Sequence, residues 1–129
     1  MNLGVGMKHS VRWEVTPEMT AIAQRSGDLE VFSTPSLAAL IESSAYELAQ
    51  KGMDRGMTTV GSKISIRHLS PTPIGLAVWA EAKITRIREN TIDFAITAFD
   101  KIGPISEAEH TRAIVNKKRF MIITGNKLT

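Results

Sequence analysis

The hydrophobic pattern of this chain changes its period near residue 57, and this change constrains the fold more than any other feature. From residue 57 onward, apolar and polar residues alternate with a period of two, which is typical of half-buried β-strands. Turn signals divide this part into four predicted strands, at residues 57–69, 76–88, 91–100 and 104–118. Because the links between them are short, we expect strands that follow each other in the chain to pair antiparallel.

The part of the chain before residue 57 predicts one further strand and two helices. Residues 7–15 alternate loosely and indicate a strand. Residues 16–27 indicate a short helix, with Thr16 as its N-cap and Pro17 in its first turn.

The second predicted helix is the stronger one. Ser33 or Thr34 can cap its start, Pro35 fits its first turn, and Gly52 marks its end. Between these positions, apolar residues recur at spacings of three and four, namely Leu37, Leu40, Ile41, Ala45 and Leu48. Since no other element could cover a long antiparallel sheet, we expect an α+β fold in which this helix lies against it.

Size and composition indicate one globular domain that spans residues 1–129. Of these residues, 43% are hydrophobic and 22% are charged, which suits a single core. There is no run of 18 apolar residues and no secretory signal pattern, so we expect a cytoplasmic protein that does not enter a membrane. The chain has no cysteine, which excludes disulfides, thiolate metal sites and a cysteine nucleophile.

The charge of the chain does not require a nucleic-acid partner. Sixteen basic residues against thirteen acidic ones give a net charge of only +3. The densest basic cluster, at residues 116–120, has no interleaved aromatic residues on which bases could stack. We interpret it as the solvated end of an edge strand rather than a phosphate site, and we expect no nucleic-acid binding.

Glu42 is unusual because it is an acid inside an apolar helix. On a helical projection it falls at the margin of the apolar face, between Ala38, Tyr46 and Ala49. A partly buried carboxylate there would have a raised pKa and could transfer protons near neutral pH. The alternative is a boundary residue that reaches water through its flexible side chain.

His68 and Thr34 are the other two candidates for a site. Strand alternation places His68 on the same face as Val60, Ile64 and Ile66, which is the face expected to meet the helix. His68 could be a satisfied core histidine, and Thr34 could be a simple helix cap. Alternatively, a hydroxyl, a carboxylate and an imidazole converge where the helix contacts the sheet, and such a set suits acyl transfer.

The order and spacing of Thr34, Glu42 and His68 resemble the fluoroacetyl-CoA thioesterase-like family of the hot-dog superfamily. Residues 55–78, RGMTTVGSKISIRHLSPTPIGLAV, are similar to that family's glycine, histidine and Thr-Pro segment. Residues 108–115, AEHTRAIV, are similar to its final-strand His-x-Arg motif. The resemblance covers about residues 7–120.

This resemblance implies a hot-dog fold, in which an antiparallel sheet wraps one central helix, and a homodimer or higher homo-oligomer with its sites at the interface. It implies that Thr34, Glu42 and His68 form the catalytic set, that Gly61 offers its backbone to the substrate, and that Arg112 helps to hold the substrate. Glu42 would act either as a base toward water or as the nucleophile. No metal or other cofactor is implied, because coenzyme A is part of the substrate.

The expected function is hydrolysis of a short or small acyl-CoA thioester to the free acid and coenzyme A. The alternatives are a non-catalytic acyl-CoA-binding module and an acyl-CoA hydratase or dehydratase, for which we find no recognisable Asp and His motif. Considered without the family, Gly61 is equally well explained by a β-bulge and Arg112 by a surface charge. Residues 17–32 could cover the acyl pocket.

Overall fold

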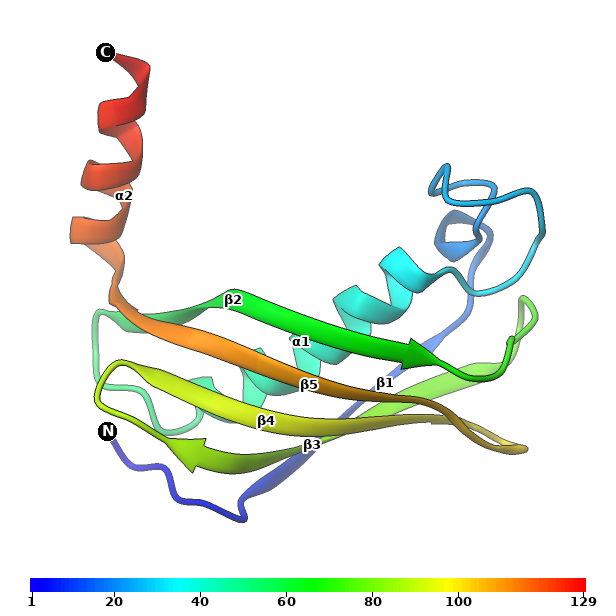
Figure 1. The fold of residues 1–129 in the computed structure, drawn as a ribbon, viewed down its shortest axis with the longest axis horizontal. Helices are drawn as coiled ribbons and strands as arrows, with labels where there is room; N and C mark the ends of the chain where they lie inside the picture. Colours follow the sequence, from blue (N-terminus) through cyan, green and yellow to red (C-terminus); the bar gives the residue numbers. More distant parts are fainter.

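The computed structural model describes residues 1–129 as a five-stranded antiparallel sheet that curves around one long helix (Figure 1). The strands are β1 (Lys8–Glu14), β2 (Met57–His68), β3 (Ala77–Ile87), β4 (Thr91–Asp100) and β5 (Gly103–Asn116). The helices are α1 (Thr34–Gln50) and α2 (Lys117–Gly125), with short 3-10 helices η1 (Pro17–Met19) and η2 (Asn126–Leu128). The predicted α+β class is confirmed.

The strand order across the sheet is β1-β3-β4-β5-β2, and every neighbouring pair is antiparallel. The expected pairing of consecutive strands is confirmed for β3 with β4 and for β4 with β5. It is wrong for β2, which pairs with β5 and not with β3. The reason is that the link after β2 is not a tight turn: Pro73 forms a bridge with Val31, and the Thr72 carbonyl accepts the N–H of Phe32.

A β-bulge in β2 reverses the alternation of side chains partway along the strand. Gly61 pairs with Arg112 of β5 and Lys63 pairs with Thr111, so Ser62 is an extra residue. Before the bulge, the residues that face α1 are Thr59 and Gly61. After it, they are Ile64, Ile66 and His68. The evidence is that each of these residues pairs with a residue of β5 that points to the inner face of the sheet. Because the bulge shifts the pattern by one residue, the prediction that Val60 shares the face of His68 is wrong.

Helix α1 begins as its sequence predicts. Ser33 is the N-cap, and its hydroxyl accepts the N–H of Ser36 at 3.1 Å. The hydroxyl of Thr34 is therefore not needed as a cap. The helix ends at Gln50, two residues before the glycine that was expected to stop it.

The core lies between α1 and the concave face of the sheet. The apolar residues that predicted α1 are all fully buried there: Leu37, Leu40, Ile41, Ala45 and Leu48. They belong to one cluster of 19 buried hydrophobic residues, which also includes inward-facing side chains of β3 and β4. Burying a side chain of the size of leucine contributes about 1.5–3 kcal/mol, so this contact fixes α1 on the sheet.

The predicted helix at residues 16–27 is wrong except for its first turn. Only η1 forms there, and turns follow it. Thr20 ends the helix, because it forms a bridge with Phe32 and its hydroxyl donates to the Pro17 carbonyl while accepting the N–H of Ala23. This segment stands over the N-terminal end of α1 (Figure 1).

The basic cluster at residues 116–120 is not the end of an edge strand, as the sequence suggested. Strand β5 lies inside the sheet, and helix α2 begins at Lys117 with Asn116 as its N-cap. Helix α2 projects from the sheet beside the N-terminal part of β2 (Figure 1). No helix of the protein is both long enough and apolar enough to cross a membrane.

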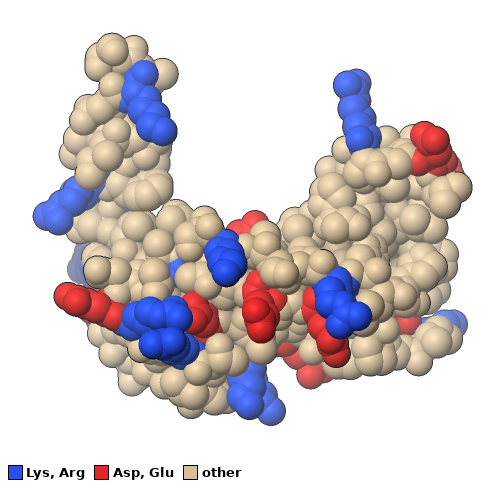
Figure 2. Space-filling view, viewed as in Figure 1, with Lys and Arg blue, Asp and Glu red and all other residues tan.

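Helix α2 projects at one end of the molecule, and the segment before α1 projects at the other. Between them, above the edge formed by β2, the surface is concave, and we call this concave surface the saddle (Figure 2). Acidic and basic side chains are interspersed along the body of this face. Neither sign forms a continuous patch, which agrees with the small net charge of +3.

The fully buried Leu40 provides a test of how α1 is held. Its replacement by alanine should lower the free energy of unfolding by about 2–5 kcal/mol, because the packed core cannot close the resulting cavity. Urea titration measures this loss. Tyr46→Ala is the matched control on the exposed side of the same helix, since Tyr46 is 42% exposed. A similar loss in both variants would contradict the burial of Leu40 against the sheet.

Candidate active site

Glu42 of α1 forms an ion pair with Arg112 of β5. Its Oε2 atom accepts a hydrogen bond from Arg112 Nη1 at 3.2 Å and lies 3.7 Å from Nε2 of His110. The Glu42 side chain is 44% exposed, so the carboxylate is held on one side and open to solvent on the other. This position at the edge of the apolar face is the one that the helical projection predicts.

Arg112 is buried, being only 6% exposed, and its donors are directed to fixed partners. Nε donates to Thr59 Oγ1 at 2.8 Å, and Nη2 donates to the Thr59 carbonyl at 3.0 Å. The guanidinium also lies 5.8 Å from the centre of the Tyr46 ring. The alternative of a surface charge is therefore wrong. Burial lowers the pKa of Arg112, and the Glu42 carboxylate opposes this effect.

His110 is a member of this cluster that the sequence interpretation did not select. It is 2% exposed, and its Nδ1 lies 2.8 Å from the carbonyl of Lys63. A carbonyl only accepts, so Nδ1 carries the proton, and Nε2 accepts from Arg112 Nη1 at 3.2 Å. The available signal was its strand alternation with Arg112, which places both side chains on the inner face of β5.

Burial is the main reason that the pKa of His110 lies below its ordinary value. The positive charge of Arg112 lowers this pKa further, while the Lys63 backbone and the Glu42 carboxylate act in the opposite direction. His110 is therefore a neutral hydrogen-bonding group that helps to hold Arg112 against Glu42.

Gly61 lies directly beside the Glu42 carboxylate. A Cβ atom at this position would collide with Oε2 of Glu42 and would lie 3.3 Å from Cε1 of His110. Gly61 is also the last paired residue before the bulge of β2. The β-bulge explanation of this glycine is therefore confirmed, and the absence of a side chain also leaves room for the Glu42 carboxylate. That Gly61 offers its backbone to the substrate stays a prediction.

Thr34 and His68 form a second pair at the N-terminal end of α1. Thr34 Oγ1 lies 2.9 Å from His68 Nδ1. His68 Nε2 is buried and has no hydrogen-bond partner. Burial lowers the pKa of His68, and the Ser70 backbone partly opposes the change.

The structure brings the five predicted residues together as two groups rather than one. Glu42, Gly61 and Arg112 form one group, and Thr34 and His68 form the other. The two groups are separated by eight residues of α1, which is about 12 Å along the helix axis. No hydrogen bond or ion pair joins Glu42 to His68 within the chain. Both groups lie where α1 meets the edge strand β2.

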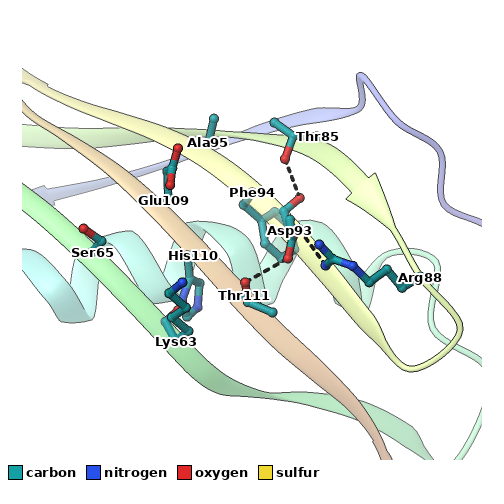
Figure 3. Close-up of a pocket in the computed structure, with 10 residues that line it drawn as sticks. All are labelled: Lys63, Ser65, Thr85, Arg88, Asp93, Phe94, Ala95, Glu109, His110 and Thr111. Carbon is teal, nitrogen blue, oxygen red and sulfur yellow. Dashed lines mark hydrogen bonds and ion pairs between the residues drawn. The ribbon is translucent and has the colours of Figure 1, made fainter.

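A hollow of about 630 Å³ lies on the opposite face of the sheet (Figure 3). Its polar side chains largely bind each other: Arg88 pairs with Asp93 at 2.6 Å, and Thr111 donates to the same carboxylate at 2.8 Å. It contains no predicted site residue. The candidate active site is therefore the pair of groups on the helix side.

Comparison with known proteins identifies several similar ones. A family model described as fluoroacetyl-CoA-specific thioesterase matches residues 15–118. The fluoroacetyl-CoA thioesterase of Streptantibioticus cattleyicolor is 25% identical over 91 residues, which cover 70% of this chain and 66% of that protein.

Solved structures resemble the whole chain. A mutant of the fluoroacetyl-CoA thioesterase FlK in complex with acetyl-CoA matches with a TM-score of 0.93 and 21% identity, over 98% of this chain and all of the other. A hot-dog-like protein from Thermanaerovibrio acidaminovorans matches with a TM-score of 0.89 and 21% identity, over 97% and 93% of the two chains. These matches confirm the predicted hot-dog fold.

Removing the charge of Arg112 should change the titration of His110. In Arg112→Met, His110 should titrate at a higher pH than in the original protein, because the neighbouring cation no longer opposes its protonation. NMR titration of the histidine rings measures this shift. Arg88→Met, on the other face of the sheet, is the control and should leave His110 unchanged. An unchanged His110 in Arg112→Met would contradict the arrangement.

The two buried imidazoles should also make stability depend on pH. Burial lowers the pKa of His68 and His110 below the ordinary value of 6.5, so in mild acid the unfolded chain binds protons that the folded protein does not. Their contribution to stability is complete above about pH 6.5 and is lost as the pH falls below it. Urea unfolding between neutral pH and pH 5 measures the slope. The double variant His68→Gln, His110→Gln should show a smaller slope, and an equal slope would contradict the prediction.

Proposed function

The chain belongs to the fluoroacetyl-CoA-specific thioesterase family, and on this premise we propose that it hydrolyses a short or small acyl-CoA thioester to the free acid and coenzyme A. One observation carries the proposal: the Glu42 carboxylate is fixed on one side by Arg112 and open on the other. The acetyl-CoA in the similar FlK structure supports a small acyl group.

In this proposal, Glu42 starts the reaction at the thioester carbonyl. It can take a proton from a water molecule that attacks the carbonyl carbon. It can also attack that carbon itself, which releases the thiolate of coenzyme A and leaves an anhydride for water to cleave. Both routes need an accessible carboxylate in a fixed position, and Arg112 and the space left by Gly61 provide it.

Thr34 and His68 are proposed to stabilise the negative charge that develops on the carbonyl oxygen and on the leaving sulfur. The carbonyl oxygen becomes negative during attack, and the leaving sulfur needs a proton or a donor. The hydrogen-bonded hydroxyl and imidazole can supply these, and they lie at the positive end of the α1 dipole.

The distance between the two groups supports a homodimer. Within one chain, about 12 Å of helix separates Thr34 from Glu42, too far for both to touch a single carbonyl group. Strand β2 has an open edge above which the molecule is hollowed as a saddle (Figure 2). If two copies pair antiparallel along β2, the beginning of one strand lies beside the end of the other. Gly61 and Glu42 would then approach His68 of the partner subunit.

The proposed reaction uses only water and side chains of the protein, with coenzyme A leaving as part of the substrate. We propose no metal or other cofactor, no nucleic-acid partner and a cytoplasmic location.

Turnover of a panel of acyl-CoA thioesters, followed by release of free thiol, tests this function. Glu42→Gln and His68→Ala should each lower kcat by about a hundredfold or more, as expected for residues that transfer protons or attack the substrate. Glu47→Gln, five residues further along α1 and exposed, is the matched control and should keep full activity.

Two outcomes would contradict the assignment. Unchanged rates in both Glu42→Gln and His68→Ala would remove these residues from the mechanism. Acyl-CoA binding in calorimetry with all the thioester recovered intact would instead indicate a non-catalytic binding module.

A further inference from the structure

Two polar side-chain atoms that are buried in this protein have no hydrogen-bond partner. They are Nε2 of His68 and Oγ of Ser106. The two residues are direct neighbours across the sheet, because His68 of β2 pairs with Ser106 of β5 in register. Paired residues on adjacent antiparallel strands project to the same face, with Cβ atoms about 4.5–5.5 Å apart. The two unpartnered atoms therefore belong to one place on the helix side of the sheet.

A serine is an unusual choice for this position. Ser106 is 0% exposed, and a buried hydroxyl without a partner destabilises a protein. Its neighbours on the same face are alanines: Ala98, its partner on β4, and Ala108, two residues further along β5. An alanine would pack equally well in this row and would leave no polar atom unsatisfied. The hydroxyl of Ser106 thus calls for a role other than packing.

We propose that Ser106 is a positioning residue for His68, whose Nε2–H donates to the Ser106 hydroxyl directly or through one buried water. Rotation about χ1 of Ser106 moves its oxygen among three staggered positions, so the hydroxyl can turn toward the ring. The inference rests on the proposed function, in which His68 and Thr34 take part in proton transfer.

This contact would fix the tautomer of His68. With the ring proton on Nε2, Nδ1 is the free acceptor, and it lies 2.9 Å from the hydroxyl of Thr34. A proton that arrives from the Thr34 side then binds Nδ1 and forms an imidazolium. Both N–H groups of the imidazolium have acceptors, Thr34 at Nδ1 and Ser106 at Nε2. Without Ser106, the proton on Nε2 would have no side-chain partner.

No charged side chain on the surrounding elements takes this role. Asp100, the buried acid of β4, already accepts from the Thr72 hydroxyl and from the N–H of Ile102. Arg67 and Glu107, which flank the pair on β2 and β5, are partners on the outer face of the sheet. On α1, the nearest acid toward this face is Glu42, about 12 Å along the axis. Asp28 and Glu30, in the segment before α1, are exposed. The positive end of α1 and burial both oppose a charge on His68, and the Ser70 backbone offsets this only in part, so an acceptor at Nε2 would make the ring easier to protonate.

NMR of the imidazole nitrogens tests the inference directly, because the chain has only three histidines and His68→Ala identifies the signals of His68. In the original protein, neutral His68 should carry its proton on Nε2. In Ser106→Ala the population should move to the Nδ1–H tautomer, and His68 should titrate about one pH unit lower. The reason is that losing the Ser106 acceptor destabilises the charged imidazolium more than the neutral ring. Ser106→Cys, of similar size but a weaker acceptor, should lie between.

Kinetics provide a second readout. Ser106→Ala should lower kcat about tenfold, the rate equivalent of one pH unit in pKa, and should change KM little. Ser44→Ala is the matched control, since Ser44 is another fully buried serine whose hydroxyl already donates to the Ile41 carbonyl at 2.7 Å. It should change neither the tautomer of His68 nor kcat.

The outcomes separate this inference from the proposed function. The tautomer and the titration are measured without substrate, so they decide the role of Ser106 even if no thioester is hydrolysed. An Nδ1–H tautomer in the original protein would overturn the inference. So would Ser106→Ala with the same tautomer and the same titration as the original protein.

Discussion

The contact between the Glu42 carboxylate of α1 and the Arg112 guanidinium of β5 organises the rest of the site. A buried arginine destabilises a protein unless its donors have acceptors. Thr59, His110 and Glu42 supply those acceptors from three different elements. The arginine therefore links α1 to β2 and β5 near the centre of the helix, and Glu42 is the only one of these three acceptors that stays half exposed.

Two features of the sheet follow from this contact. The carboxylate needs space next to β2, and Gly61 provides it where a Cβ atom would collide. The bulge that begins at Gly61 then reverses the alternation of side chains along β2, so that His68 faces α1 and reaches Thr34. A local irregularity in one edge strand thereby places both groups of the site on the same side of the sheet. The two groups stay separated along α1, because Glu42 comes eight residues after Thr34 in the helix, and this separation makes a second copy of the chain part of the proposed mechanism.

Some structural elements could not be predicted because local patterns have competitors. Residues 16–27 have helical capping signals, yet the bridge between Thr20 and Phe32 ends the helix after one turn. The basic cluster before Phe120 suits a strand end, but Asn116 caps a helix there. His110 was visible as an inward-facing residue, whereas its link to Lys63 depends on the register of β2 against β5.

The sequence by itself determined the α+β class, the apolar face of α1, the limits of the long strands and the identity of the five candidate residues. Periodicity and capping act between residues near in sequence, so they can be read from the chain alone. Only the tertiary structure decided the strand order, the bulge, the role of His110 and the division of the candidates into two groups. These depend on contacts between residues that are far apart in the sequence, such as Thr34 with His68, separated by 34 positions, and Glu42 with Arg112, separated by 70. Which residues meet over such separations is set by how α1 and the sheet pack as wholes.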